Sequence, residues 1–198
     1  ELLVLFHRSP HLGYSHHGHP LFDIRACRST DEGGSWSPAR YITSDPLGGV
    51  IDFGTHTLGD GSIFLHASAV ALVPTEDHSS ATEWVSGAGR PFWVRSGDDG
   101  LSFSEPQRFP AVPGDPCAGR NTEHRGICRS GLAQLPDGRL FLPGKAPSNP
   151  DTRGMPYFGM CWFSADMGDT WEYGGKIAED QLAHFSEPAV HLTPSGRL

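Results

Sequence analysis

The chain has 198 residues with 15 Lys and Arg against 23 Asp and Glu, and this formal net charge of −8 argues against a protein that binds the nucleic-acid backbone. Its longest apolar runs, residues 2–6 and 70–73, are far too short to cross a bilayer, so we expect neither a nucleic-acid partner nor a membrane span. The 25 Gly and 17 Pro predict many turns, while 11 Phe and 5 Trp are enough to build a core, which excludes low-complexity disorder.

A motif of the form S-x-D-x-G-x-[ST]-[WF] occurs three times along the chain. Its aspartates, Asp31, Asp98 and Asp166, are 67 and 68 residues apart. Between two strands such a segment predicts a hairpin turn, because the Asp side chain can accept backbone N–H groups and the Gly can adopt left-handed backbone. The final aromatic side chain is expected to fold back onto the sheet. The three copies are residues 29–36, 96–103 and 164–171.

A second, shorter turn alternates with this motif. It reads Leu-x-Asp-Gly-x-[IL] at residues 58–63 and 135–140, with a looser copy at 192–198 that has Ser-Gly in place of Asp-Gly. Gly after Asp supplies the positive φ that a tight β-hairpin needs. Each repeat of about 67 residues therefore predicts four strands, and no stretch has helical periodicity over more than about two turns.

Repeated four-stranded sheets are the blades of a β-propeller, so the sequence predicts an all-β fold. In chain order, residues 1–42 are expected to form the outer part of one blade, 50–109 a second, 126–177 a third and 185–198 the first strand of a fourth. A ring needs at least four blades, and three repeats cannot close one. We therefore interpret residues 1–198 as a single partial propeller domain.

The longer motif is the Asp box, or BNR repeat, and the whole chain resembles the sialidase superfamily. This resemblance implies a six-bladed β-propeller of the sialidase type, of which about three blades are present. The Asp box is specific for this kind of blade and not for an activity. The resemblance implies a carbohydrate partner, either a glycan or a sialoside-like substrate.

Strand order places both short turns on the same rim, which we call the Asp-box rim. The longer connections emerge on the opposite rim, which we call the long-loop rim. Short turns on one rim and long loops on the other are typical of a scaffold that presents a site. Asp31, Asp98 and Asp166 are consequently expected to be structural. The long connections are residues 9–20, 43–52, 71–90, 109–126, 143–156 and 178–187.

Four ionisable residues of the long-loop rim, Arg8, Asp52, Arg125 and Glu187, lie where a strand meets its loop. Arg8 ends a strand, and the other three introduce successive innermost strands, so we expect all four to converge on one opening. Guanidinium groups suit a sugar carboxylate, and Glu187 or Asp52 is expected to manage a proton as catalytic residues. The alternative is that these residues neutralise one another in salt bridges between blades. His19 is expected to contact sugar hydroxyls.

The segment that begins at Phe185 resembles the sialidase stretch in which a Glu precedes an innermost strand. In that family this Glu pairs with a Tyr nucleophile and tunes its phenol, because an anionic substrate would repel a carboxylate nucleophile. The resemblance assigns this role to Glu187, and it places the Tyr and the remaining arginines outside residues 1–198. It also implies an acid/base Asp in the loop of residues 9–20, but this loop contains no Asp.

Two functions therefore stay open. The first is a sialidase-like glycoside hydrolase that acts on an acidic sugar in the central pocket. The second is a non-catalytic propeller that binds glycan or protein through the same loops. We expect no cofactor and no metal in either case, since His16, His17 and His19 form only a weak ligand pattern in a loop.

The four cysteines show no CxxC spacing, which argues against a structural zinc site. Cys117 and Cys128 flank one loop and could form a disulfide if the protein is exported, or could be free thiols. The cellular location stays open, with the cell exterior and the periplasm among the alternatives.

Overall fold

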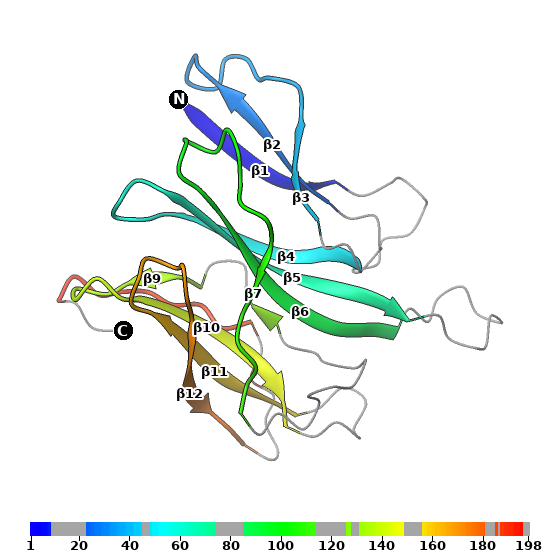
Figure 1. Cartoon of the computed structure of the whole chain (residues 1–198), viewed down its shortest axis with the longest axis vertical. Coiled ribbons are helices and arrows are strands. Elements are labelled where there is room, and N and C mark those ends of the chain that lie inside the picture. The colour runs from blue at the N-terminus through cyan, green and yellow to red at the C-terminus, as the bar shows by residue number, and fades with distance from the viewer. Residues whose placement is uncertain are drawn as a thin grey trace.

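All the regular structure of the described residues is β-strand. A computed structural model describes residues 1–8, 23–44, 48–73, 85–113, 126–127, 131–148, 156–180, 185 and 187–195. Within these ranges the chain forms three separate antiparallel sheets and no helix, and hence no helix that could cross a membrane (Figure 1). The predicted all-β fold is confirmed. Strands of neighbouring repeats belong to different sheets, as the blades of a propeller require.

The first sheet has three described strands in the order β1-β2-β3. They are β1 (Leu2–Arg8), β2 (Asp23–Ser29) and β3 (Arg40–Thr43). The second sheet has four strands in the order β4-β5-β6-β7. They are β4 (Gly48–Thr57), β5 (Ile63–Val73), β6 (Val85–Ser96) and β7 (Gln107–Arg108).

The third sheet follows the order β12-β11-β10-β8, and β9 also pairs with β10. Its strands are β8 (Gly126–Ile127), β9 (Ala133–Gln134), β10 (Leu140–Pro147), β11 (Tyr157–Ser164) and β12 (Glu172–Ala178). The described residues 187–195 form no strand, so the start of a fourth blade stays a prediction.

The first sheet corresponds to the outer three strands of the second sheet. Asp boxes join β2 to β3, β6 to β7 and β11 to β12, which makes β1 the equivalent of β5 and β10. In the second sheet β4 covers the inner edge of β5. No strand covers the matching edge of β1 within the described part of the chain.

The apolar core consists of two clusters, one in each space between neighbouring sheets. Ile24 of the first sheet packs with Leu65 and Phe92 of the second. Phe64 of the second sheet packs with Trp162 and other residues of the third. Because an apolar sheet face must be buried against another element, these clusters hold the sheets face to face.

The aromatic residue that ends each Asp box packs between its own sheet and the sheet that precedes it in the chain. Phe103 packs against the cluster between the first and second sheets, and Trp171 packs against the cluster between the second and third. The equivalent Trp36 is 44% exposed, because no described sheet precedes the first. The expected folding back of the aromatic therefore links one blade to the blade before it.

The Asp boxes have the turn geometry that the sequence predicts. In each box the Asp carboxylate accepts a backbone N–H from the residue four positions later. The three N···O distances are 2.8 Å for Asp31, 2.8 Å for Asp98 and 2.9 Å for Asp166. The box glycines Gly33, Gly100 and Gly168 have φ of 95°, 73° and 95°. The predicted structural role of these aspartates is supported by the bonds that each makes within its own hairpin.

The ends of the long strands define the long-loop rim in space. Cross-strand pairs at these ends are Arg8 with Asp23, Val73 with Val85, and Pro147 with Tyr157. The opposite ends carry the Asp-Gly turns and the Asp boxes, and Figure 1 shows these turns at the left and the paired strand ends at the right. A site at the long-loop rim is therefore separated from the Asp boxes by the length of the strands.

Candidate functional site

The structure places three of the five predicted site residues. Arg8 is the last residue of β1, Asp52 lies in β4, and Glu187 lies beyond the third sheet. Arg125 and His19 lie outside the described residues. Arg8 pairs with Asp23, and the convergence of Arg8, Asp52 and Glu187 on one opening stays a prediction.

Arg8 forms an ion pair with Asp23, the first residue of β2. The two residues are direct partners in the β1–β2 register, so their side chains share one face of the sheet. Arg8 Nε donates to Asp23 Oδ1 over 3.3 Å, and Arg8 Nη2 lies 3.1 Å from Asp23 Oδ2. The carboxylate side chain is 9% exposed, whereas the Arg8 side chain is 55% exposed.

A second arginine, Arg25, binds the same carboxylate. Its Nε and Nη2 donate to the two oxygens of Asp23 over 3.1 Å and 2.9 Å, which is the bidentate geometry that guanidinium and carboxylate favour. The Arg25 guanidinium also lies over the ring of Tyr41, 5.7 Å from its centroid. Two cations around one anion leave this group of three side chains with one excess positive charge.

The environment of Asp23 decides its protonation. Burial alone raises the pKa of this carboxyl, but hydrogen bonds and charge from Arg25, followed by those from Arg8, outweigh burial and hold its pKa below the usual value. Asp23 is therefore ionised at neutral pH. An ionised carboxylate can accept hydrogen bonds from arginines but cannot donate a proton as a general acid.

Asp52 is the fifth residue of β4, the innermost strand of the second sheet. It is partly buried and pairs with Ser68 of β5. The register between β4 and β5 shifts between Val50 and Asp52. Because β4 already begins at Gly48, Asp52 lies inside the strand, and its predicted position at the point where the loop meets the strand is wrong.

Glu187 is exposed and has a left-handed backbone, with φ of 53°. This conformation is uncommon for a residue with a Cβ and costs about 1–2 kcal/mol. The segment is held at the long-loop rim, because the N–H of Phe185 donates to the carbonyl of Tyr157 over 3.1 Å. Glu187 follows this anchor by two residues, which supports its predicted place near that rim.

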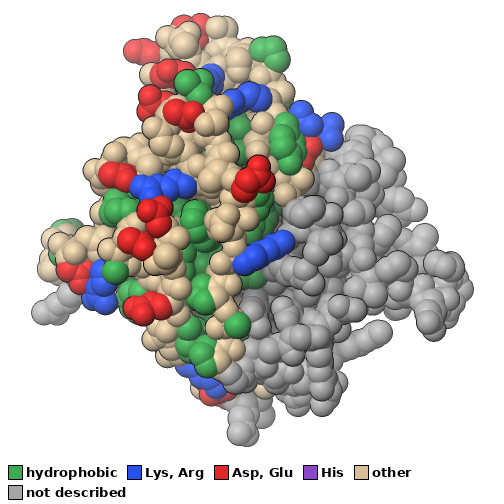
Figure 2. All heavy atoms as spheres, in the orientation of Figure 1, with side chains coloured by type: hydrophobic (Ala, Val, Ile, Leu, Met, Phe, Trp, Pro, Cys, Tyr) green, Lys and Arg blue, Asp and Glu red, His purple; other side chains and the backbone are tan. Residues whose placement is uncertain are grey.

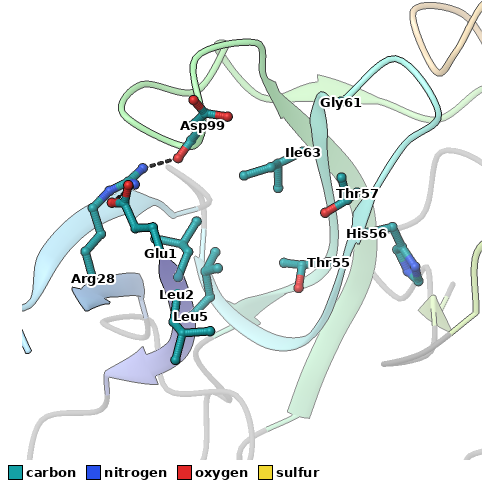
Figure 3. Close-up of a pocket in the computed structure, with 11 residues that line it drawn as sticks. Glu1, Leu2, Leu5, Arg28, Thr55, His56, Thr57, Gly61, Ile63 and Asp99 are labelled. Atoms are coloured by element: carbon teal, nitrogen blue, oxygen red, sulfur yellow. Dashed lines mark hydrogen bonds and ion pairs between the residues drawn. The ribbon is translucent and has the colours of Figure 1, made fainter. Parts of the chain in front are cut away.

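A cavity of about 500 Å³ lies between β1 and β4, near the Asp-box rim. In Figure 3 the side chain of Ile63 points into this space and the ring of His56 points away from it, while Arg28 donates to the carbonyl of Asp99. Its lining is mixed: apolar side chains of β1 face threonines of β4, beside the ion pair of Arg28 with Glu1. The cavity borders the uncovered edge of β1 and lies away from the predicted site.

No group of three His, Cys, Asp or Glu is placed to hold a metal ion within the part of the chain that the structure describes. On the face shown in Figure 2, acidic and basic side chains are interspersed over the described surface.

Sequence reasoning did not single out Asp23 and Arg25. The available signal was position: Asp23 comes directly after the long first loop, and strand pairing must bring it close to Arg8 at the other end of that loop. Arg25 follows at the spacing that returns a side chain to the same face of a strand. The resemblance predicts an acid/base Asp within residues 9–20, and Asp23 lies three residues beyond that range.

Comparison with known proteins identifies the kind of repeat. The profile of a family described as the BNR repeat-like domain matches residues 3–198. No curated protein matches the sequence. A crystal structure of a protein of unknown function from Dyadobacter fermentans is similar over 98% of this chain, with 24% identity and a TM-score of 0.76.

Two solved sialidases are also similar in fold. The Trypanosoma rangeli sialidase in complex with the inhibitor DANA matches 86% of this chain with 15% identity and a TM-score of 0.56. A sialidase mutant from Streptococcus pneumoniae matches 89% with 11% identity and a TM-score of 0.56. The chain spans 56% of the Dyadobacter protein and 28% and 43% of these two sialidases. At these identities the likeness shows a shared fold.

Proposed function

Because the chain belongs to the BNR repeat-like domain family and has the sialidase-type propeller fold, we propose that it binds an acidic sugar at the long-loop rim as part of a glycoside hydrolase. The observation that carries this proposal is the cluster of Arg8, Asp23 and Arg25, which has two positive charges and one negative charge. Guanidinium groups recognise a carboxylate through paired, charge-assisted hydrogen bonds.

The residues take the following roles in this proposal. Arg8 and Arg125 bind the carboxylate of the sugar, and His19 contacts its hydroxyl groups. Glu187 tunes the nucleophile or carries a proton, with Asp52 as the second carboxylate. The anchoring of Phe185 to Tyr157 supports the place of Glu187, and the position of Arg8 at the end of β1 supports its access to ligand.

A second candidate function is the binding of glycan without hydrolysis. It is favoured by the lack of Asp in residues 9–20 and by the ionised state of the Asp23 carboxylate. Arg25 and Arg8 keep the pKa of Asp23 low, so this carboxyl does not supply the proton that a departing sugar needs. The same arginines would serve a binding protein equally well.

Turnover of a fluorogenic sialoside by the full-length protein tests the proposal. We expect turnover in the unsubstituted protein and at least about a 100-fold lower kcat in Glu187→Gln, the usual size of a lost proton-transfer group. Glu172→Gln removes an exposed carboxylate from β12 and is the matched control. Binding of sialic acid without turnover would favour the second function, and a protein that neither binds nor cleaves sialosides would contradict the recognition of an acidic sugar.

A further inference from the structure

One carboxylate, that of Asp23, holds two arginines that differ in freedom. Arg25 is 23% exposed and is fixed by two hydrogen bonds to Asp23 and by its contact with the ring of Tyr41. Arg8 is 55% exposed, and within the described residues only Asp23 pairs with its guanidinium. The guanidinium of Arg25 is therefore held in place and mostly shielded from solvent, whereas that of Arg8 is accessible to a ligand.

The guanidinium of Arg8 retains hydrogen-bond donors for a ligand. A guanidinium has five N–H groups, and Asp23 engages the Nε and Nη2 groups of Arg8. Asp23 occupies the edge formed by Nε and Nη2, and no described residue pairs with Nη1. Side chains alternate along β2, so Asp23 lies on the opposite face from Ile24, which packs toward the second sheet. The cluster is thus not enclosed between these two sheets.

Without an anchor, a long exposed arginine side chain samples many rotamers and loses conformational entropy when it binds. Two contacts to a nearly buried carboxylate remove most of that freedom in advance. Arg25 has a distinct task, because it supplies a second positive charge that keeps the carboxylate ionised while Arg8 is engaged with a ligand.

We propose that Asp23 is a positioning residue that holds the guanidinium of Arg8 ready for the carboxylate of an acidic sugar. In this proposal Arg25 is the fixed positive charge that balances the negative charge of Asp23. This inference rests on the proposed function for the identity of the ligand. It assigns to Asp23 a role in affinity that acts through Arg8, without contact between Asp23 and the sugar.

The substitution Asp23→Asn separates positioning from simple charge. It makes the cluster more positive by one unit, so electrostatic attraction alone predicts tighter binding of an anion. Positioning predicts weaker binding, because the neutral amide is a poor anchor for two guanidinium groups. The full-length protein is titrated with sialic acid by calorimetry, with Asp60→Asn as control. Asp60 also pairs with an arginine, Arg95, but at the Asp-box rim.

We expect the Kd of Asp23→Asn to rise about tenfold, the loss that matches a weakened charge-assisted pair, and the Kd of Asp60→Asn to stay unchanged. An unchanged or lower Kd in Asp23→Asn would overturn the positioning role. The neutral methyl ester of the sugar should bind weakly and equally to all three proteins.

A second measurement does not depend on the ligand. Phenylglyoxal modifies free guanidinium groups, and peptide mass spectrometry gives the rate at Arg8. We expect this rate to rise several-fold in Asp23→Asn and to stay at the unsubstituted value in Arg25→Gln, which retains the carboxylate. A rate at Arg8 that is equal in all variants would overturn the anchoring. If the unsubstituted protein binds no acidic sugar while the rates change as expected, the ligand assignment fails and the anchoring of Arg8 stands.

Discussion

Arg95 of the second sheet donates to the carboxylate of Asp169 in the Asp box of the third sheet, over 2.6 Å. Arg28 occupies the same place one repeat earlier, directly before the serine of its own Asp box, and it donates to the carbonyl of Asp99 in the next box. Successive blades are therefore connected at the Asp-box rim by an arginine at a repeated position. These contacts complement the apolar clusters between the sheets.

Replacement of Arg95 by Met is expected to lower the free energy of unfolding by about 1 kcal/mol at low salt. Arg95 also binds Asp60 and donates to Ser62 Oγ over 3.0 Å, so three contacts are lost together. Chemical denaturation at low and high salt measures the effect. In the control Arg139→Met, the lost ion pair lies within a single turn, and an equal cost there would contradict the role between blades.

Removal of an Asp-box carboxylate should destabilise the protein without a selective loss of ligand binding. Asp166 accepts hydrogen bonds from the Thr170 N–H at 2.9 Å and from the Ser164 hydroxyl at 2.8 Å. Asp166→Ala is expected to cost about 1–2 kcal/mol because these donors lose their acceptor. Thermal unfolding checks this value against Glu172→Ala, an exposed carboxylate on the neighbouring strand. An unchanged Tm in Asp166→Ala would refute the structural role.

The repeat predicted the sheets and turns well because both depend on local chemistry. Asp-Gly between two apolar strands favours a tight hairpin, and a hairpin pairs the strands on both sides of it. The linking arginines could not be predicted in the same way, since Arg28 reaches a carbonyl in another repeat, and nothing in the spacing identifies that partner. The Asp23 cluster was missed for a related reason: two arginines sharing one carboxylate is a property of side-chain packing.

The pH dependence of stability should report on a buried histidine. His66 is fully buried, and its Nε2 lies 3.3 Å from Nε2 of His56. Burial, followed by the charge of His56, lowers the pKa of His66 to about 3. The unfolded chain binds a proton below the ordinary pKa of 6.5, so the stabilising contribution is complete above pH 6.5 and is lost as the pH falls toward 3.

Urea unfolding between pH 7 and pH 4 measures this loss, which approaches about 1.4 kcal/mol per pH unit for one group. The Asp-box carboxylates titrate separately, because hydrogen bonds from Ser102 lower the pKa of Asp98 to about 2. His66→Phe should flatten the profile, because it removes the buried group that gains a proton on unfolding. Stability that is constant from pH 7 to pH 4 would contradict the assignment.

Two glycines with left-handed backbone allow strain and packing to be separated. Gly138 has φ of 89° and open space around the position of a Cβ, so Gly138→Ala is expected to cost about 1 kcal/mol from backbone strain alone. Gly168 has φ of 95°, and a Cβ there would lie 3.0 Å from the Phe64 ring of the previous sheet. Gly168→Ala should therefore be clearly more destabilising in denaturant titrations. Equal costs would show that this contact between blades has no energetic weight.

A structure of the full-length protein with sialic acid bound would show whether Arg8 binds the carboxylate of an acidic sugar, since it locates the ligand independently of turnover. We expect the sugar at the long-loop rim, with its carboxylate oxygens about 3 Å from guanidinium nitrogens of Arg8 and with Asp23 still paired to that arginine. A sugar bound at the Asp-box rim, or one whose carboxylate faces away from Arg8, would contradict it.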